Sequence, residues 1–245
     1  MTRLLLALVL GVSLASADAA GAKTAAPMPP PTGWKAVLIA GDDHEKAFDN
    51  AVDAMAGKLA SFGVPSSNVS VLKATLYDAH GATEANVRRA LSEMSPGPME
   101  GCFVFITSHG AEGRGLALVR DAAFRSPAEL GGLLKRGCGK RPTVVVASGC
   151  YSGGFAAGSA MPAANRVILT AARRDRPSFG CDAGRRYTVF DQCVLQSMQI
   201  GMRWAGLMGR TRRCVSAYER RAGETPSDPQ LSVGRAVDRL KVFTP

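Results

Sequence analysis

A histidine and a cysteine follow two apolar segments of this 245-residue chain. The segment 102–107 (CFVFIT) leads into a Ser-His-Gly triplet centred on His109, and the segment 143–147 (TVVVA) leads into a Ser-Gly-Cys triplet ending at Cys150. Residues just past the carboxyl ends of neighbouring parallel strands share one crevice. There an imidazole can favour the thiolate, which is the nucleophilic form of cysteine, and can then protonate a leaving amine. The pair therefore predicts nucleophilic catalysis.

Ordinary structural roles are the alternatives for these side chains. Cys150 could be one more buried thiol, which is common for cysteine, and His109 could be a hydrogen-bonded loop residue. The other two histidines, His44 and His80, lie in polar surroundings and do not follow an apolar strand. The dipeptide His80-Gly81 is expected in a turn. Zinc-like spacing of cysteine and histidine is not present in the sequence, so neither a metal nor another cofactor is expected.

The elements that must position the pair alternate between strands and helices. Apolar runs predict strands at 34–40, 68–72, 102–107, 143–147 and 166–172, with a further short apolar stretch at 116–119 after a glycine-rich loop. Helical periodicity and end signals predict helices near 44–62, 85–94 (capped by Thr83), 126–135, 188–198, 213–221 and 232–242. This order predicts an α/β fold in which helices cover both faces of a mostly parallel sheet. One domain is expected over 33–245.

The first 32 residues have a different composition. Residues 1–17 combine a basic start, an apolar stretch at 4–14 and an Ala-Ser-Ala cleavage signal, as in a secretory signal peptide cut after Ala17. An uncleaved anchor or a buried first helix is the alternative. The Ala/Pro-rich residues 18–32 are expected to be a flexible spacer. Since no apolar stretch is long enough for a membrane span, the mature protein is expected to be periplasmic or secreted.

The chain carries a formal charge of +10, and much of the excess lies after residue 135. Such a surface would attract anionic polymers, lipid headgroups or acidic proteins, although solvated helix faces explain basic clusters equally well. The clusters are not interleaved with aromatic residues of the kind that single-strand binders use for stacking. Specific nucleic-acid binding is therefore not expected.

The two triplets, together with their flanking segments, resemble the caspase-like cysteine peptidases, and among these the bacterial form of the legumain family, peptidase family C13. Four segments carry the resemblance: the Ala-Gly-Asp-Asp turn after the first strand, SHG, SGCYSGG at 148–154, and TAA…SFGC at 170–181. The resemblance implies a caspase-like three-layer fold and an endopeptidase that cuts protein or peptide substrates. It makes Cys150 the nucleophile, His109 the acid and base, and the N–H groups of Gly110 and Cys150 the oxyanion hole.

The positions that build the family's primary substrate pocket are altered in this chain. The resemblance places Asp49, Asn50, Ser148 and Asp191 there, and asparaginyl members carry Arg and His at the first two positions and Glu at the third. Ala47 stands where some members have an orienting asparagine. If Asp49 and Asp191 line one pocket, it would be acidic and prefer Lys or Arg at the cleaved position. Both could instead be ordinary acids on helix surfaces.

Six cysteines in an exported chain favour disulfides. Setting the candidate nucleophile aside leaves five. Cys102 and Cys138 are expected near the amino ends of adjacent strands, where a bridge is possible, and Cys193 and Cys214 on successive helical segments. Cys181 would then be the cysteine without a disulfide partner. Other pairings are equally compatible with the sequence.

Two further functions fit the same fold. A transpeptidase would pass the acyl group to an amine instead of to water. A non-catalytic binding protein would keep the fold alone, and the departures at Ala47 and Ser148 leave room for that. The intact His109 and Cys150 argue for the enzyme.

Overall fold

The computed structural model describes residues 27–180 and 184–243. The predicted signal peptide, the first part of the spacer and Cys181 lie outside these residues. The end of the predicted spacer is attached to the domain: the Met28 N–H donates to the Ala236 carbonyl, and the Thr32 N–H to the Met99 carbonyl (both 2.8 Å). Within the described part, no helix combines the length and apolar character needed to cross a membrane.

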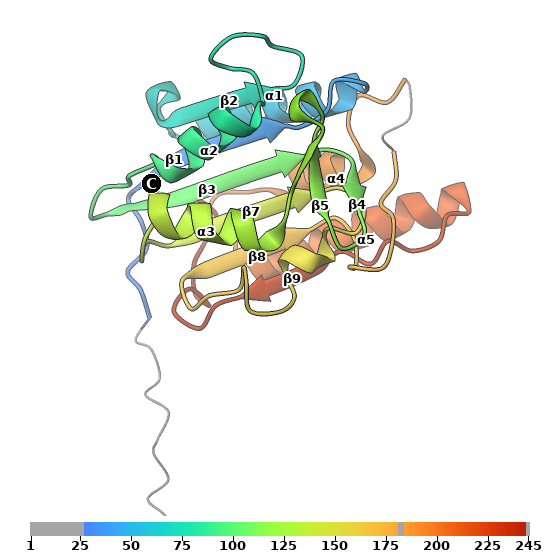
Figure 1. Cartoon of the computed structure of the whole chain (residues 1–245). Helices are drawn as coiled ribbons and strands as arrows, with labels where there is room; N and C mark the ends of the chain where they lie inside the picture. The colour runs from blue at the N-terminus through green and yellow to red at the C-terminus, as the bar shows by residue number, and fades with distance from the viewer. Residues whose placement is uncertain (1–26, 181–183, 244–245) are drawn as a thin grey trace, which may run out of the picture.

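A six-stranded sheet forms the centre of the molecule (Figure 1). Its strands, in spatial order, are β2 (Val69–Lys73), β1 (Gly33–Ala40), β3 (Glu100–Thr107), β7 (Thr143–Ser148), β8 (Arg166–Thr170) and β9 (Gln230–Val233). The first five are parallel, and β9 pairs with β8 in the antiparallel direction. Every residue of β7 and β8 is buried, which is why continuous apolar runs predicted them.

Helices cover both faces of the sheet, so the predicted three-layer α/β fold is confirmed. The helices α1 (Lys46–Ser61), α4 (Val189–Ser197) and α5 (Trp204–Ala222) pack on one face, where Phe103 and Phe105 of β3 join their core. The helices α2 (Glu84–Ser92) and α3 (Pro127–Gly137) pack on the other face with Val104 and Ile106. We call these the α1/α4/α5 face and the α2/α3 face.

Two helix starts follow the predicted end signals. The Thr83 hydroxyl accepts a hydrogen bond from the Asn86 N–H at the start of α2. Ser126 and Glu129 form a reciprocal capping box at the start of α3. These caps satisfy backbone N–H groups that lack partners within a helix.

The glycine-rich segment after β3 is more regular than predicted. It forms a small antiparallel sheet of β4 (Gly110–Ala111), β5 (Gly115–Leu118) and β6 (Ala123–Arg125). Leu116 and Leu118 are buried and join the core of the α2/α3 face, so the short apolar stretch anchors this hairpin to the main sheet. The hairpin begins immediately after His109 and therefore belongs to the candidate site.

The predicted helix at 232–242 is wrong. The segment begins as the end of β9 and continues as turns. Its apolar residues have helical spacing, but the free edge of β8 takes up the backbone of 230–233. Gly234 then fits tightly against a neighbouring chain segment, since an added Cβ would lie 2.1 Å from the Ala163 carbonyl oxygen. In contrast, α5 begins at Trp204, nine residues before the predicted start.

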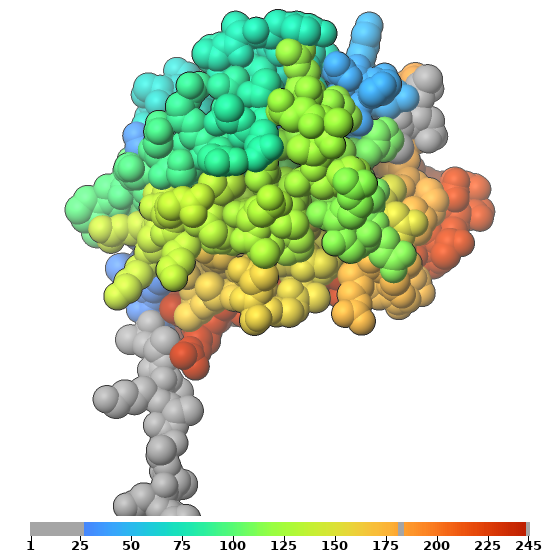
Figure 2. Space-filling model, in the orientation of Figure 1, coloured from blue at the N-terminus to red at the C-terminus, as the bar shows by residue number. Residues whose placement is uncertain are grey.

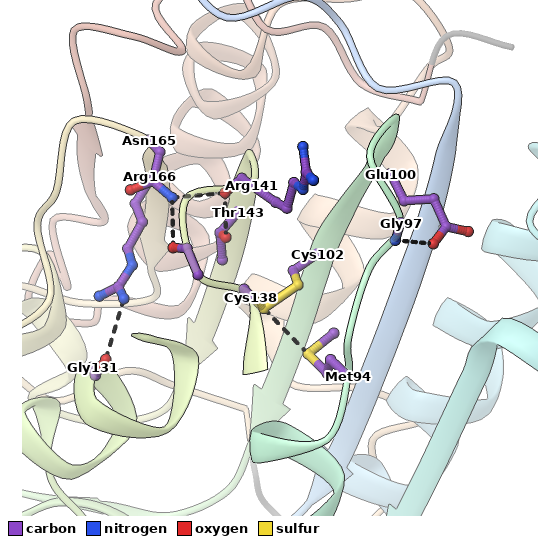
Figure 3. The surroundings of a disulfide bond; sticks show 11 residues. Met94, Gly97, Glu100, Cys102, Gly131, Cys138, Arg141, Thr143, Asn165 and Arg166 are labelled. Carbon is purple, nitrogen blue, oxygen red and sulfur yellow. Dashed lines mark hydrogen bonds between the residues drawn. A yellow bond between two sulfur atoms is a disulfide. The ribbon is translucent and has the colours of Figure 1, made fainter. Parts of the chain in front are cut away.

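Both predicted disulfides are present. Cys102 of β3 is bonded to Cys138, which ends α3, and Met94 lies beside this bridge with its sulfur 3.6 Å from that of Cys138 (Figure 3). Cys193 of α4 is bonded to Cys214 of α5. The first bridge joins the sheet to a helix on the α2/α3 face, and the second joins two helices on the opposite face.

The α4–α5 bridge is expected to stabilise the domain appreciably. Replacing both Cys193 and Cys214 by Ala should lower the free energy of unfolding by about 3 kcal/mol, because a bridge that closes a loop of 21 residues restricts the unfolded chain. Urea denaturation followed by circular dichroism measures the change. As a control, a reducing agent should destabilise the wild type more than this variant, which lacks one of the two bridges described here. Equal urea midpoints for variant and wild type would contradict the expectation.

Candidate active site

The segments that carry His109 and Cys150 lie side by side. They follow β3 and β7, which are neighbours in the sheet, and the last residues of these strands, Thr107 and Ser148, are register partners. The next residue, Ser108, continues the pairing by donating its N–H to the Ser148 carbonyl at 3.1 Å. The carboxyl ends of two central parallel strands thus bring the two triplets to one place.

A glycine in each triplet permits the close approach. A Cβ on Gly110 would lie 2.0 Å from the carbonyl oxygen of Cys150, so any side chain there would push the segments apart. A Cβ on Gly149 would lie 2.5 Å from the Ser108 carbonyl oxygen and 2.4 Å from a methyl group of Leu116. The backbone after His109 therefore rests directly on the backbone of Cys150.

The imidazole of His109 has an aromatic support. Phe48 of α1 meets the ring edge to face, with centroids 5.3 Å apart and an interplanar angle of 82°. The His109 carbonyl accepts a hydrogen bond from the Ala117 N–H of β5 at 2.8 Å. A buried helix residue and the hairpin thus fix this histidine from two directions.

The thiol of Cys150 is half-buried against Ser178. The Ser178 N–H donates to Sγ at 3.3 Å, its hydroxyl lies 3.8 Å from Sγ, and its carbonyl oxygen accepts from Sγ at 3.5 Å. The next residue, Tyr151, has a left-handed backbone (φ 58°), and its N–H donates to the Arg176 carbonyl. Ser178 belongs to the SFGC segment that carried the resemblance, but its contact with Sγ was not predicted from the sequence.

Ser148 ends β7, Asp191 belongs to α4, and both are buried. The Thr107 hydroxyl donates to Oδ2 of Asp191 at 2.7 Å, and Oδ1 has no hydrogen-bond partner among the described residues. Burial raises the pKa of Asp191, while the nearby hydroxyls of Ser148, Thr107 and Thr188 act in the opposite direction. Asp191 is therefore a desolvated carboxyl group near the strand ends that carry the candidate pair.

Asp49 and Asn50 lie near the start of α1 and are half-buried. The Asp49 carboxylate accepts from the Thr75 hydroxyl at 2.6 Å, and the Asn50 amide donates to the Arg186 carbonyl at 3.1 Å. Since Asp191 has no exposed surface, Asp49 and Asp191 do not form one open acidic pocket here. Ala47 is buried in α1 and offers no polar group.

The remaining histidines lie apart from this arrangement. His80 is in a turn, as predicted, where its N–H donates to Asp78. His44 is exposed, and its ring pairs with the buried Asp42 at 2.7 Å, which raises the pKa of His44. Asp42, Asp43 and His44 place three ligand atoms within 4.8 Å of one another. Clusters of this kind are common on protein surfaces without an ion, so we assign it no role.

The fold and the arrangement at its sheet edge define a caspase-like protein. A crystal structure of caspase-1 from Spodoptera frugiperda is similar over 83% of this chain and 88% of its own, with a TM-score of 0.60 and 13% sequence identity. At this identity the similarity establishes the fold alone. No curated protein sequence matches the chain.

The family follows from the sequence itself. The peptidase C13 family model matches residues 80–200, which include both triplets, Ser178 and Asp191. The chain belongs to the peptidase C13 family, the legumain family of caspase-like peptidases, and is a cysteine-type peptidase.

The buried carboxyl group predicts a pH-dependent stability. Because the pKa of Asp191 is raised in the folded state, its stabilising contribution is complete below its unfolded pKa of about 3.9 and is lost as pH rises through the folded value. Asp191→Asn removes this titration. Relative to that variant, the wild type should therefore become less stable between pH 4 and pH 8, as measured by urea denaturation.

A matched control is Asp238→Asn, which changes an exposed aspartate. Its stability should differ from that of the wild type by a nearly constant amount over the same pH range. A constant difference for Asp191→Asn as well would contradict the burial argument.

Proposed function

We propose that the protein is an exported endopeptidase in which Cys150 is the nucleophile and His109 is the general acid and base. The observation that carries this proposal is the contact between the two triplets, where the backbone at Gly110 lies against the Cys150 carbonyl. Both side chains follow adjacent central strands, on a fold of the caspase type. Membership of a cysteine peptidase family supports the same assignment.

The chemistry has two stages. In the first, His109 takes the proton of the Cys150 thiol, the thiolate sulfur bonds to the scissile carbonyl carbon, and the N–H groups of Gly110 and Cys150 stabilise the oxyanion. The carbon–nitrogen bond breaks as the His109 imidazolium gives its proton to the leaving nitrogen. In the second, His109 takes a proton from water, which attacks the thioester and releases the carboxylic acid and the thiol.

Two features support export. Residues 1–17 have the organisation of a signal peptide. The domain also contains two disulfides, which persist in oxidising compartments and are rare in the cytosol. A periplasmic or secreted location accounts for both.

A preference for Lys or Arg before the scissile bond rests mainly on Asp49. This carboxylate is half-buried at the start of α1, one residue after the Phe48 that supports His109. Asn50 ties the same turn of helix to the segment before α4. The buried Asp191 strengthens the preference only if substrate binding opens a path to its unpaired Oδ1.

The nucleophile and the base can be tested separately. Cys150→Ala should abolish peptide cleavage, and His109→Ala should lower kcat/KM by about 10²–10⁴-fold, since that is the usual contribution of a positioned acid or base. A peptide acyloxymethyl ketone should label Cys150 in the wild type, as located by mass spectrometry. Labelling at another cysteine, or none, would refute the assignment. A product joined to an added amine would reveal transpeptidation instead of hydrolysis.

The preference before the scissile bond has its own test. In fluorogenic peptides that differ only at this residue, Arg and Lys should be cleaved faster than Asn and Asp. Asp49→Asn should reduce the Arg-to-Asn ratio of kcat/KM by roughly 10-fold, because it removes a charge-assisted hydrogen bond while keeping the side-chain shape. The control Asp53→Asn, an exposed acid one turn along α1, should leave the ratio unchanged. Selective cleavage after Asn by the wild type would exclude the preference.

A further inference from the structure

A cavity of about 400 Å³ lies beside the candidate reactive pair. It is lined by the β4–β5 hairpin, the start of α3, the short 3-10 helix η3 (Ser152–Phe155) and the loop after β8. Ala111, Pro127, Tyr151, Gly154 and Phe155 line it together with Glu112, Arg174 and Asp175. We call it the leaving-side cavity. None of the substrate-binding residues predicted from the sequence contributes to it.

The cavity begins where the chain segments that follow His109 and Cys150 diverge. Ala111 is the second residue after His109, and Tyr151 is the first after Cys150. Between them, the backbones meet at the contact of Gly110 with the Cys150 carbonyl. The cavity therefore begins two residues after His109 and one residue after Cys150. A substrate held at Cys150 has to place its next residue close by.

The two faces of the sheet distinguish the two sides of a bound peptide. The acyl-side candidates Asp49 and Asp191 belong to α1 and α4, and Phe179, next to the Ser178 that contacts Sγ, packs on the same α1/α4/α5 face. Phe155 of the cavity belongs to the core of the opposite α2/α3 face. A peptide that crosses the sheet edge at Cys150 would thus place its leaving part over the α2/α3 face.

The proposed role of His109 as general acid also places the leaving part of the substrate over the α2/α3 face. A general acid must lie within hydrogen-bond reach of the leaving nitrogen. The residue that carries this nitrogen then lies beside the chain that follows His109, which is the hairpin wall of the cavity. Figure 2 views the α2/α3 face, where the green hairpin residues lie above the yellow residues that follow β7 and the orange residues that follow β8.

The cavity is lined by the apolar residues Ala111, Pro127 and Phe155, by Tyr151 and glycines, and by the charged residues Glu112, Arg174 and Asp175. Phe155 is almost fully buried. The carboxylate of Asp175 is held by both Nε and Nη2 of Arg173 at 2.5 and 2.8 Å. Asp175 is therefore not free to select a cationic side chain. The volume is ample for a side chain of the size of leucine or phenylalanine.

We propose that the leaving-side cavity binds an apolar side chain of the residue that directly follows the scissile bond. The proposal rests on the proposed function, since it needs a peptide attacked by Cys150. The leaving-side cavity is then a second determinant of specificity. It acts independently of any preference for the residue before the scissile bond. Leu, Met and Phe are the expected class.

The wild-type protein tests this with peptides of one sequence. Cut sites are first mapped by mass spectrometry in a peptide mixture, and the residue after one cut is then varied among Leu, Phe, Gly, Lys and Asp. The Leu and Phe peptides should have a kcat/KM about 10-fold or more above that of the Gly peptide, because burial of a large apolar side chain is favourable. Faster cleavage before Lys or Asp, or equal rates for all five, would overturn the proposal.

Filling the cavity gives a sharper test. A Cβ on Gly154 would lie 3.8 Å from Pro127 Cγ, which is an ordinary contact, so Gly154→Leu projects its side chain into the cavity. This variant should reduce the Leu-to-Gly rate ratio toward one, and Gly154→Ala should reduce it partly. Gly132→Leu in α3 is the matched control, since the nearest neighbour of its Cβ would be a flexible Arg136 at 3.9 Å. The control should keep the wild-type ratio.

An aldehyde with the sequence before the cut separates the possible failures. Its reactive carbon carries only hydrogen on the leaving side, so its affinity reports folding, Cys150 and the acyl side alone. Equal aldehyde affinity of the wild type and Gly154→Leu, together with a Leu-to-Gly rate ratio near one in the variant, supports binding of the apolar side chain in the cavity. If Gly154→Leu keeps the wild-type Leu-to-Gly rate ratio and binds the aldehyde equally well, the proposed role of the cavity is wrong. The proposed peptidase function would still stand. Absence of both cleavage and aldehyde binding in the wild type overturns the proposed function as well.

Discussion

The pairing of β3 with β7, extended by one residue beyond the strands, is the constraint on which the site depends. The Ser108 N–H continues the ladder to the Ser148 carbonyl, and the chain then turns so that Gly110 lies on the Cys150 carbonyl. No flexible side chain bridges the gap, because backbone meets backbone. A shift of one residue in this register would exchange the faces of all side chains along the strand and separate His109 from Cys150.

The elements around this contact each support one part of it. Phe48 of α1 holds the imidazole, the hairpin holds the His109 carbonyl, and Ser178 contacts the sulfur. Beneath them, α4 places Asp191 against Thr107 at the end of β3. The disulfide from α4 to α5 then ties this supporting helix to the longest helix of the domain. The candidate reactive groups thus directly follow two central strands and are surrounded by segments from both faces.

The sequence predicted those features of the fold that a local pattern of apolar and polar residues determines. The central strands are buried on both faces, so continuous apolar runs identified them, and the triplets at their ends indicated His109 and Cys150 as the candidate pair. The hairpin at 110–125 was missed because glycine-rich segments contain few side chains that carry a periodic signal. The helix predicted at 232–242 failed because pairing with the edge of β8 outweighs the helical spacing of Val233, Val237 and Leu240.

The site was predictable only in part, for a related reason. The positions of His109 and Cys150 depend on strand ends, which pattern reveals. The burial of Asp191 depends on how α4 packs under the sheet, and the Ser178 contact joins residues 28 apart in the chain. Both depend on tertiary packing, which one sequence does not display.

The distribution of sulfur across the sheet has a consequence for maturation. Cys102 lies near the amino end of β3, whereas Cys150 lies past the carboxyl end of β7, about 20 Å away along strands that rise roughly 3.3 Å per residue. Disulfides form through thiolate attack, and a reactive thiol is the side chain most prone to join a wrong bridge or be oxidised. Once β3 and β7 pair, that distance separates Cys150 from the Cys102–Cys138 bridge. Pairing of these two strands thus keeps the sulfur of the candidate nucleophile away from the structural sulfur of that bridge.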